Sequence, residues 1–190
     1  MERQEEIYPE CNVDTNLMGF IIGGAVKHKH CCNEVAKALN GTDGFAIGVV
    51  DDDKRPATFD DGFVPHESTW SHVAFYPHKD GKRFLFKIHK AMDEFVFDMA
   101  RDMRVDLRDL GYPDTLMEFK KITKREDASQ NPKLRKLFAK IADNRELTAF
   151  RNTVRYLVHA KYQADVNVAK DFFDGKLTTD DLRRILASTP

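Results

Sequence analysis

The sequence predicts an α/β fold, in which a mainly parallel sheet with an antiparallel hairpin at its edge is followed by a helical C-terminal half. Two observations support this prediction. Strand-like and helix-like segments alternate in the first part of the chain, which is typical of parallel strands joined by right-handed crossovers. From residue 91 onward, apolar residues recur at intervals of three and four, which is typical of amphipathic helices. We therefore expect an α/β core at residues 1–90 and a helical extension at 91–190 that packs on it.

The predicted strands are short segments bounded by helix caps or turn residues. In the first part of the chain they are expected at residues 6–11, 25–30 and 45–50. The last of these, FAIGVV, is almost continuously apolar, as expected for a strand that is buried on both faces. The later segment SHVAFYPHKDGKRFLFKIH predicts two further strands around Asp80 and Gly81, a dipeptide that is common in hairpin turns.

Helices are predicted where apolar residues follow a helical spacing behind a capping residue. The first is expected at 14–22 with Asp14 or Thr15 as its N-cap, and the second at 34–39 with Asn33 as its N-cap. In the second half, apolar stripes predict helices near residues 92–103, 132–141, 147–157 and 178–186.

The composition is that of a folded, globular chain. Of its 190 residues, 42% are hydrophobic and 32% are charged, with a net charge of −1, which argues against a disordered protein. No apolar run is long enough to cross a bilayer, and the acidic, polar N-terminus does not resemble a signal peptide. Cys11, Cys31 and Cys32 are odd in number and close together, unlike a disulfide scaffold. We expect a cytoplasmic protein without a membrane interaction; its oligomeric state is left open.

Acidic residues follow two of the predicted strands. Glu10 lies at the end of the first strand, and Asp51, Asp52 and Asp53 follow the third. Because ligands of α/β proteins bind beyond the carboxyl ends of parallel strands, we expect these carboxylates to converge. Their hard oxygen atoms suit Mg²⁺. Side chains alternate along a strand, so Asp51 and Asp53 are expected to share one side and Asp52 to point elsewhere.

The order of these residues resembles the Toprim domain of bacterial primases, type II topoisomerases and the overcoming-lysogenization-defect nucleases. In that family a glutamate follows the first strand, often in the pattern Glu-Gly-x-x-Asp, and an Asp-x-Asp pair follows the third. PECNVD and VVDDDK show the same order, with Glu10, Asp14, Asp51 and Asp53 at the matching positions, over residues 6–56. The resemblance implies Mg²⁺ or Mn²⁺ held by Asp51 and Asp53, with Glu10 as a further ligand or as the general acid or base.

The chain departs from this family in two places. Cys11 stands where a glycine usually follows the glutamate, and Lys54, Arg55 and Pro56 stand where small residues usually follow the aspartates. The helical second half matches no primase or topoisomerase element. The chain therefore looks more like a small stand-alone Toprim-like protein than like a part of a replication enzyme.

Further residues are candidates for the same site. Asp14, His30, Lys54 and Arg55 are the candidates for substrate binding; His30 is included because it ends the second predicted strand. Glu94, near the start of the helix after the hairpin, is a candidate ligand for a second metal ion. The alternative for Glu94 is a solvated acid that interacts favourably with the helix dipole.

Two other features suggest binding. The segment HKHCC supplies zinc-binding atoms, but its adjacent cysteines lack the second, separated pair of a structural zinc site, and the alternative is a solvated strand end. Residues 120–140 contain eight Lys or Arg against two acids, which makes this segment a candidate contact for nucleic acid. The alternative is that these bases form the polar faces of two helices.

Three functional hypotheses follow. The first is a divalent-metal-dependent phosphoryl-transfer protein, specifically a nuclease that uses Glu10 and the Asp51-x-Asp53 pair. The second is a non-catalytic, degenerate Toprim-like module that binds a partner. The third is an enzyme that acts on a small phosphorylated metabolite.

Overall fold

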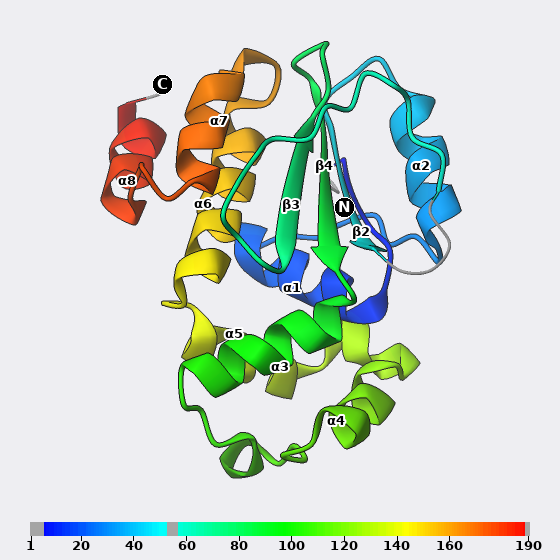
Figure 1. Cartoon of the computed structure of the whole chain (residues 1–190), viewed down its shortest axis with the longest axis vertical. Coiled ribbons are helices and arrows are strands. Elements are labelled where there is room, and N and C mark those ends of the chain that lie inside the picture. Colours follow the sequence, from blue (N-terminus) through cyan, green and yellow to red (C-terminus); the bar gives the residue numbers. More distant parts are fainter. Residues whose placement is uncertain (1–5, 53–56, 189–190) are drawn as a thin grey trace.

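The computed structural model describes residues 6–52 and 57–188, and within them four strands form one sheet. Parallel pairing joins β1 to β2 and β2 to β4, whereas β3 is antiparallel to β4 and lies at the edge, in the order β1-β2-β4-β3 (Figure 1). The expected α/β fold, with its mainly parallel sheet, edge hairpin and helical C-terminal half, is confirmed. The strand bounds are β1 (Ile7–Pro9), β2 (Ala46–Asp52), β3 (Val73–Pro77) and β4 (Arg83–His89).

Helices connect the first two strands of the sheet and follow its last strand. Two of them, α1 (Asn12–Ile22) and α2 (Cys32–Asn40), connect β1 to β2. After β4 the described chain is helical, with bounds α3 (Met92–Asp102), η1 (Leu107–Leu110), α4 (Leu116–Thr123), η2 (Glu126–Gln130), α5 (Pro132–Ile141), α6 (Arg145–Ala160), η3 (Lys161–Gln163), α7 (Val166–Phe173) and α8 (Thr179–Ser188). None of the described helices is both long and apolar enough to cross a bilayer.

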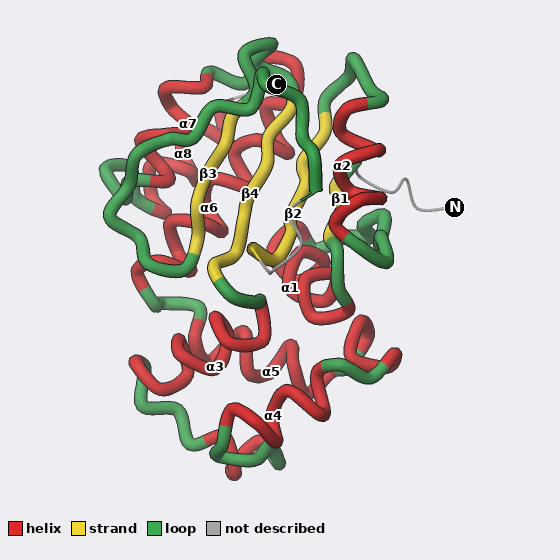
Figure 2. The backbone as a smooth tube through the Cα atoms, turned by 45° about the vertical axis from the view of Figure 1, so that its right-hand side comes forward, coloured by secondary structure: helices red, strands yellow, loops and turns green. Residues whose placement is uncertain are grey.

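The sheet is covered on both faces, as Figure 2 shows, with α2 on one side and α6 to α8 on the other. Side chains alternate along β2, so Val50 faces α2 in a small cluster with Leu39, whereas Ile47 belongs to the larger core. Gly48 lies under α2, where a Cβ atom would stand 2.6 Å from Leu39 Cδ1. A glycine is therefore required for the close approach of α2 to the sheet.

The helical half shares the larger hydrophobic core with the sheet. Phe75 of β3 packs against Phe173 of α7 with ring centroids 5.3 Å apart, and Phe86 of β4 packs against Phe150 of α6 at 5.0 Å. All four rings are fully buried. The contacts that hold the sheet therefore come from both halves of the chain.

The N-caps of the first two helices differ from those predicted. Cys11, and not Asp14 or Thr15, caps α1: its Sγ accepts a hydrogen bond from Asp14 N (3.4 Å), and Asp14 Oδ2 accepts one from Cys11 N (3.1 Å). Asp14 thus occupies position N3 of the capping box, and Cys11 occupies the N-cap position. Cys31 occupies the N-cap position of α2 without a side-chain capping hydrogen bond, and Asn33 lies inside the first turn, so that prediction was also wrong.

Both outer borders of the sheet carry additional extended chain. The strand predicted at residues 25–30 is not regular, since only Val26 is a bridge residue. The segment still runs beside β1, where Lys27 N donates to Ile7 O (2.9 Å) and Lys29 N donates to Pro9 O (2.8 Å). At the other border, the chain before β3 returns along it, and His66 N donates to Phe75 O (2.8 Å).

Candidate functional site

A pocket of about 410 Å³ lies at the carboxyl ends of β1 and β2, between the start of α1, the start of α3 and α4. Figure 2 shows this end of the strands directed toward α1, α3 and α4. The lining combines acids with bases: its charged and imidazole side chains are Glu10, Asp51, Asp93, Lys90, Lys120, Lys124, His28 and His30. A site of this composition can attract both a cation and an anion.

Glu10 and Asp51 meet through the backbone of neighbouring strands. Glu10 directly follows β1, and its N–H donates to Val49 O (3.0 Å), which continues the parallel pairing with β2. Glu10 Oε2 accepts a hydrogen bond from Asp51 N (3.0 Å), and Asp51 Oδ1 accepts one from Met92 N (2.9 Å) at the start of α3. The convergence of Glu10 and Asp51 predicted from the sequence is present in the structure.

Asp14 and Asp93 add two buried carboxylates beside this pair, with exposed fractions of 0% and 7%. One oxygen of each, Oδ1, is buried without a hydrogen-bond partner among the described residues. Lys120 Nζ lies 3.9 Å from Asp93 Oδ1, a long ion pair, and Thr123 Oγ1 donates to Asp93 Oδ2 (3.3 Å). Unpartnered buried carboxylate oxygens are costly, and a bound cation compensates for such a cost.

Burial and the repulsion of neighbouring charges raise the pKa values of Asp51 and Asp14. Burial, together with the negative charges of Asp14, Glu10 and Asp93, raises the pKa of Asp51 to about 9, although the hydrogen bond from Met92 N–H opposes the change. Burial likewise raises the pKa of Asp14 to about 7, against the hydrogen bonds of Cys11 and with the charges of Glu10 and Asp93. A positive charge placed beside Asp51 and Asp14 would favour the ionised form of both carboxylates.

The donor atoms suit a hard divalent cation, although the described side chains do not form a ready-made cage. Within residues 6–52 and 57–188, no three His, Cys, Asp or Glu side chains are placed to hold a metal ion together. Mg²⁺ commonly takes one or two protein carboxylates and completes its octahedron with water and phosphate oxygens. The arrangement fits an ion of that kind. Asp53, Lys54 and Arg55, predicted from the sequence, lie outside the described residues.

Glu94 is engaged by two lysines. Its carboxylate accepts hydrogen bonds from Lys90 Nζ (2.5 Å) and Lys120 Nζ (3.0 Å), and these bonds lower the pKa of Glu94. Asp93, one residue earlier, is the acid that lines the pocket. Sequence reasoning missed Asp93, but a signal existed: it occupies the buried side of α3 together with Val96, and a charged residue on a buried stripe is informative.

The other predicted residues fall into two groups. His30 lines the pocket, as does His28, whose Nδ1 is hydrogen-bonded to Thr15 Oγ1 (2.6 Å). Asp14 is fully buried, so the direct substrate contact expected for it finds no support. Cys31 and Cys32 form no disulfide and, within the described chain, no metal-binding group with the two histidines, so the zinc interpretation finds no support either.

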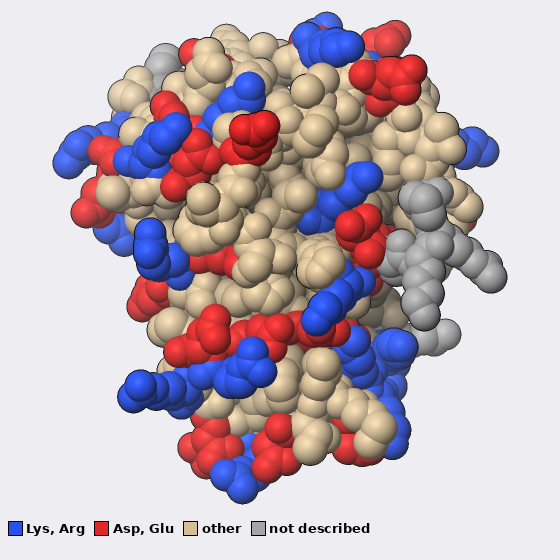
Figure 3. All heavy atoms as spheres, viewed as in Figure 1, with Lys and Arg blue, Asp and Glu red and all other residues tan. Residues whose placement is uncertain are grey.

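The basic segment at 120–140 is divided between α4, η2 and α5. Lys120 and Lys124 line the pocket, whereas Lys121 is paired with Glu118 at 2.6 Å. Figure 3 shows Lys and Arg interspersed with Asp and Glu over α3 and α4. The segment therefore supplies two cations to the rim of the pocket, and its charge on this face is mixed.

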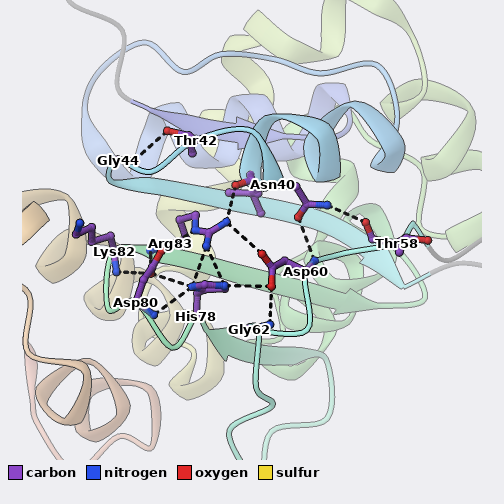
Figure 4. Close-up of polar contacts among 11 residues, drawn as sticks. Asn40, Thr42, Gly44, Thr58, Asp60, Gly62, His78, Asp80, Lys82 and Arg83 are labelled. Carbon is purple, nitrogen blue, oxygen red and sulfur yellow. Dashed lines mark hydrogen bonds and ion pairs between the residues drawn. The ribbon is translucent and has the colours of Figure 1, made fainter.

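A second polar cluster lies at the opposite end of the sheet (Figure 4). His78 is 9% exposed; Arg83 Nε donates to Asp80 Oδ2 (2.7 Å), and Arg83 Nη1 donates to Leu39 O (3.1 Å). Asp60, from the chain before β3, lies 3.4 Å from His78 Nε2. The cluster fastens the turn between β3 and β4 to α2 and to the preceding loop, which is a structural role.

Comparison of the chain with protein-family models, with curated proteins and with solved structures finds no match.

Proposed function

We propose that this chain is a Toprim-like, divalent-metal-dependent phosphoryl-transfer protein that hydrolyses phosphodiester bonds of nucleic acid. One observation carries the proposal. Glu10, Asp51 and Asp93 line one pocket at the carboxyl ends of parallel strands, and the buried Asp14 lies beside them. Asp14 and Asp93 each have one buried oxygen without a hydrogen-bond partner among the described residues. Lysines on the same rim provide attraction for a phosphate group.

Each group in the pocket has a defined part in this proposal. Asp51, with Asp53 by the family resemblance, would hold Mg²⁺ or Mn²⁺. The bound ion would polarise the scissile phosphate and lower the pKa of an attacking water. Glu10, fixed by its hydrogen bond to Asp51 N, would transfer the proton. Lys120 and Lys124 would orient the phosphate backbone.

Cleavage of single-stranded and plasmid DNA in the presence of Mn²⁺ tests the proposal. Asp51→Asn keeps an oxygen that can accept the Met92 N–H but removes the negative charge, and we expect it to lower the cleavage rate by at least about 100-fold. Asp52→Asn is the matched control, because Asp52 is the next residue of β2, is exposed and does not line the pocket. Equal cleavage by Asp51→Asn and the native protein would show that the assignment is wrong.

A non-catalytic binding module is the second candidate. It is favoured by the backbone hydrogen bonds that occupy one oxygen each of Glu10 and Asp51, since these bonds also fix the start of α3 without any catalysis. Calorimetric titration with Mn²⁺ separates the two. Metal binding that Asp51→Asn abolishes, together with an absence of cleavage, would favour the module. Cleavage that requires Mn²⁺ and Asp51 would favour the nuclease.

A further inference from the structure

A second pocket, of about 660 Å³, lies between α6, the loop at Trp70 and the start of α8. It shares no lining residue with the carboxylate pocket. Figure 1 shows α8 on the side of the molecule away from α2. Its charged lining consists of Arg145, Arg151, Arg155 and Arg183 against Asp143 and Asp180. Four positive and two negative side chains leave a net charge of +2.

The arginines of α6 are not ion-paired within the described part of the chain. Arg151 and Arg155 are four residues apart, so they project from the same face of the helix. Among the described residues, no carboxylate forms an ion pair with either of them or with Arg145, whereas Arg183 is paired with Asp180 at 2.6 Å. Arg151 Nη1 donates to Ala142 O (3.0 Å). Its Nε is buried without a partner within the described chain.

Arg151 is held in an unfavourable environment. Burial lowers the pKa of its guanidinium, and the positive charges of Arg155 and Arg183 lower it further, against the attraction of Asp143. An arginine nevertheless stays charged at any physiological pH. The repulsion among these cations is therefore a standing cost to the fold, and a bound anion would remove it.

The start of α8 also borders the pocket. Thr178, Thr179 and Asp180 all line it, so the first turn of this ten-residue helix borders the cavity. Asp180 and Asp181 in this turn offset the partial positive charge of the helix end, so the arginines supply the positive charge of the pocket. The buried Asn152 fixes this end onto α6, because its Nδ2 donates to Thr179 Oγ1 (3.1 Å).

We propose that this pocket binds a ligand through its phosphate group, with Arg151, Arg155 and Arg183 holding the phosphate oxygens. A phosphate monoester carries a charge of about −2 near neutral pH, which matches the +2 of the lining. Guanidinium groups bind phosphate oxygens in pairs and with well-defined geometry. Trp70, whose Nε1–H donates to Phe173 O, provides a fixed aromatic wall beside Arg145 for the organic part of a ligand.

Trp70 makes the proposal directly measurable, because it is the only tryptophan of the chain and it lines this pocket. The experiment follows its fluorescence during titration with inorganic phosphate and with ribose 5-phosphate, and repeats both titrations by calorimetry. A chelator is present throughout, so the result does not depend on a metal at the other site. Potassium chloride at matched ionic strength is the control. We expect a saturable response to inorganic phosphate or to ribose 5-phosphate, and none to chloride. The compound that binds more tightly shows whether the pocket recognises free phosphate or a phosphate monoester.

Two matched variants test the residues. Arg155 is exposed, so Arg155→Gln should leave the fold intact and weaken phosphate binding by about tenfold. Arg184→Gln should leave the affinity unchanged, because Arg184 is paired with Asp181 and does not line the pocket. The proposal is overturned if no saturable binding is seen up to about 10 mM phosphate, where even a millimolar site is mostly filled. It is equally overturned if Arg155→Gln binds as tightly as the native protein.

Discussion

At the scale of single residues, the acidic site works against the stability of the fold. The carboxylate of Asp51 accepts a backbone hydrogen bond, yet burial and neighbouring charges raise its pKa to about 9. An aspartate in the unfolded chain has a pKa of about 3.9, so the folded state binds an extra proton between the two values. The contribution of Asp51 to the free energy of unfolding therefore falls as the pH rises from about 4 to about 9.

Asp51→Asn should make the protein more stable and at the same time inactive. At about pH 8 the neutral amide avoids the proton uptake that Asp51 requires, and we expect a gain in the free energy of unfolding of at least about 1 kcal/mol. At about pH 4 the native protein and the variant should be equally stable. Urea unfolding at both pH values measures the difference. A gain that does not depend on pH would mean that charge is not its cause.

Gly62→Ala should destabilise the protein through the cluster in Figure 4. A Cβ atom at Gly62 would stand 1.9 Å from His78 Nε2, and the His78 ring is buried and contacted by Arg83. We expect a loss of about 1–3 kcal/mol in the free energy of unfolding, as for overpacking in other buried sites. Gly24→Ala is the control, with its nearest contact at 3.7 Å. Equal stability of the two variants would argue against a rigid His78.

Residues were predictable where a strand determined their direction. Glu10 and Asp51 follow apolar strands, and the rule that parallel strands end at one edge was enough to bring them together. Asp93 was not predictable in this way, because its position depends on how α3 is placed against the sheet. Glu94 is the adjacent acid in the sequence, and residue type alone does not distinguish it from Asp93, but its carboxylate is paired with Lys90 and Lys120.

At the scale of elements, one glutamate joins α6 to the start of β3. Glu146 is 7% exposed, and its Oε1 accepts hydrogen bonds from His72 N (2.7 Å) and Val73 N (2.9 Å). Its other oxygen contacts His72 Nδ1 (3.0 Å), while Asp98 of α3 contacts Nε2 (3.2 Å). Three elements are therefore held together by one imidazole between two carboxylates.

The stabilising effect of His72 should be strongest in mildly acidic solution. Burial lowers the pKa of His72, but Glu146 and Asp98 outweigh that effect and raise it. The contribution of its positive charge is thus fully present below the unfolded pKa of about 6.5 and is lost as the pH rises through the higher folded value. The stability difference between the native protein and His72→Gln should shrink as the pH rises, by at most about 1 kcal/mol because solvent screens the pair.

Measurement of that difference requires urea unfolding of both proteins across this pH range, and subtraction removes the contribution of Asp51. A difference that is constant with pH would show that the pKa of His72 is the same in the folded and unfolded states.

Elements were predicted well where apolar spacing was regular. Residues 25–30 show the limit of this kind of prediction. The segment donates hydrogen bonds to β1 but does not form a regular strand, and no pattern of residue types distinguishes a regular strand from such a segment. The caps show another limit of sequence-based prediction. The preference for Ser, Thr, Asp and Asn at N-cap positions favours Asp14, whereas the N-cap of α1 is Cys11, three residues earlier.

At the scale of the whole molecule, the sequence alone could not show how closely the two halves depend on each other. The apolar stripes of α6 and α7 predict buried helices but not their partner. In the structure that partner is the sheet, where Phe75 and Phe86 lie against Phe150 and Phe173. Burial of each such ring contributes about 1.5–3 kcal/mol.

Residues 1–90 expressed alone should therefore not fold, whereas the full chain should unfold in one cooperative transition. Removal of the helical half exposes the buried rings of β3 and β4, which the short sheet cannot cover by itself. Circular dichroism and a proton–nitrogen correlation spectrum of the fragment test this. A well-dispersed spectrum with a cooperative melting transition would show that the first half is an independent domain.

The extended segments that flank the sheet also limit how other chains can approach it. Along β1 the backbone is engaged by Lys27 and Lys29, and along β3 it is engaged by His66. Unpaired outer strands are the usual starting point for aggregation and for partners that bind by adding a strand. In the described part of this chain both borders are already occupied by the protein itself. A partner must therefore recognise side chains on the surface, and destabilised variants should remain soluble until these flanking segments detach.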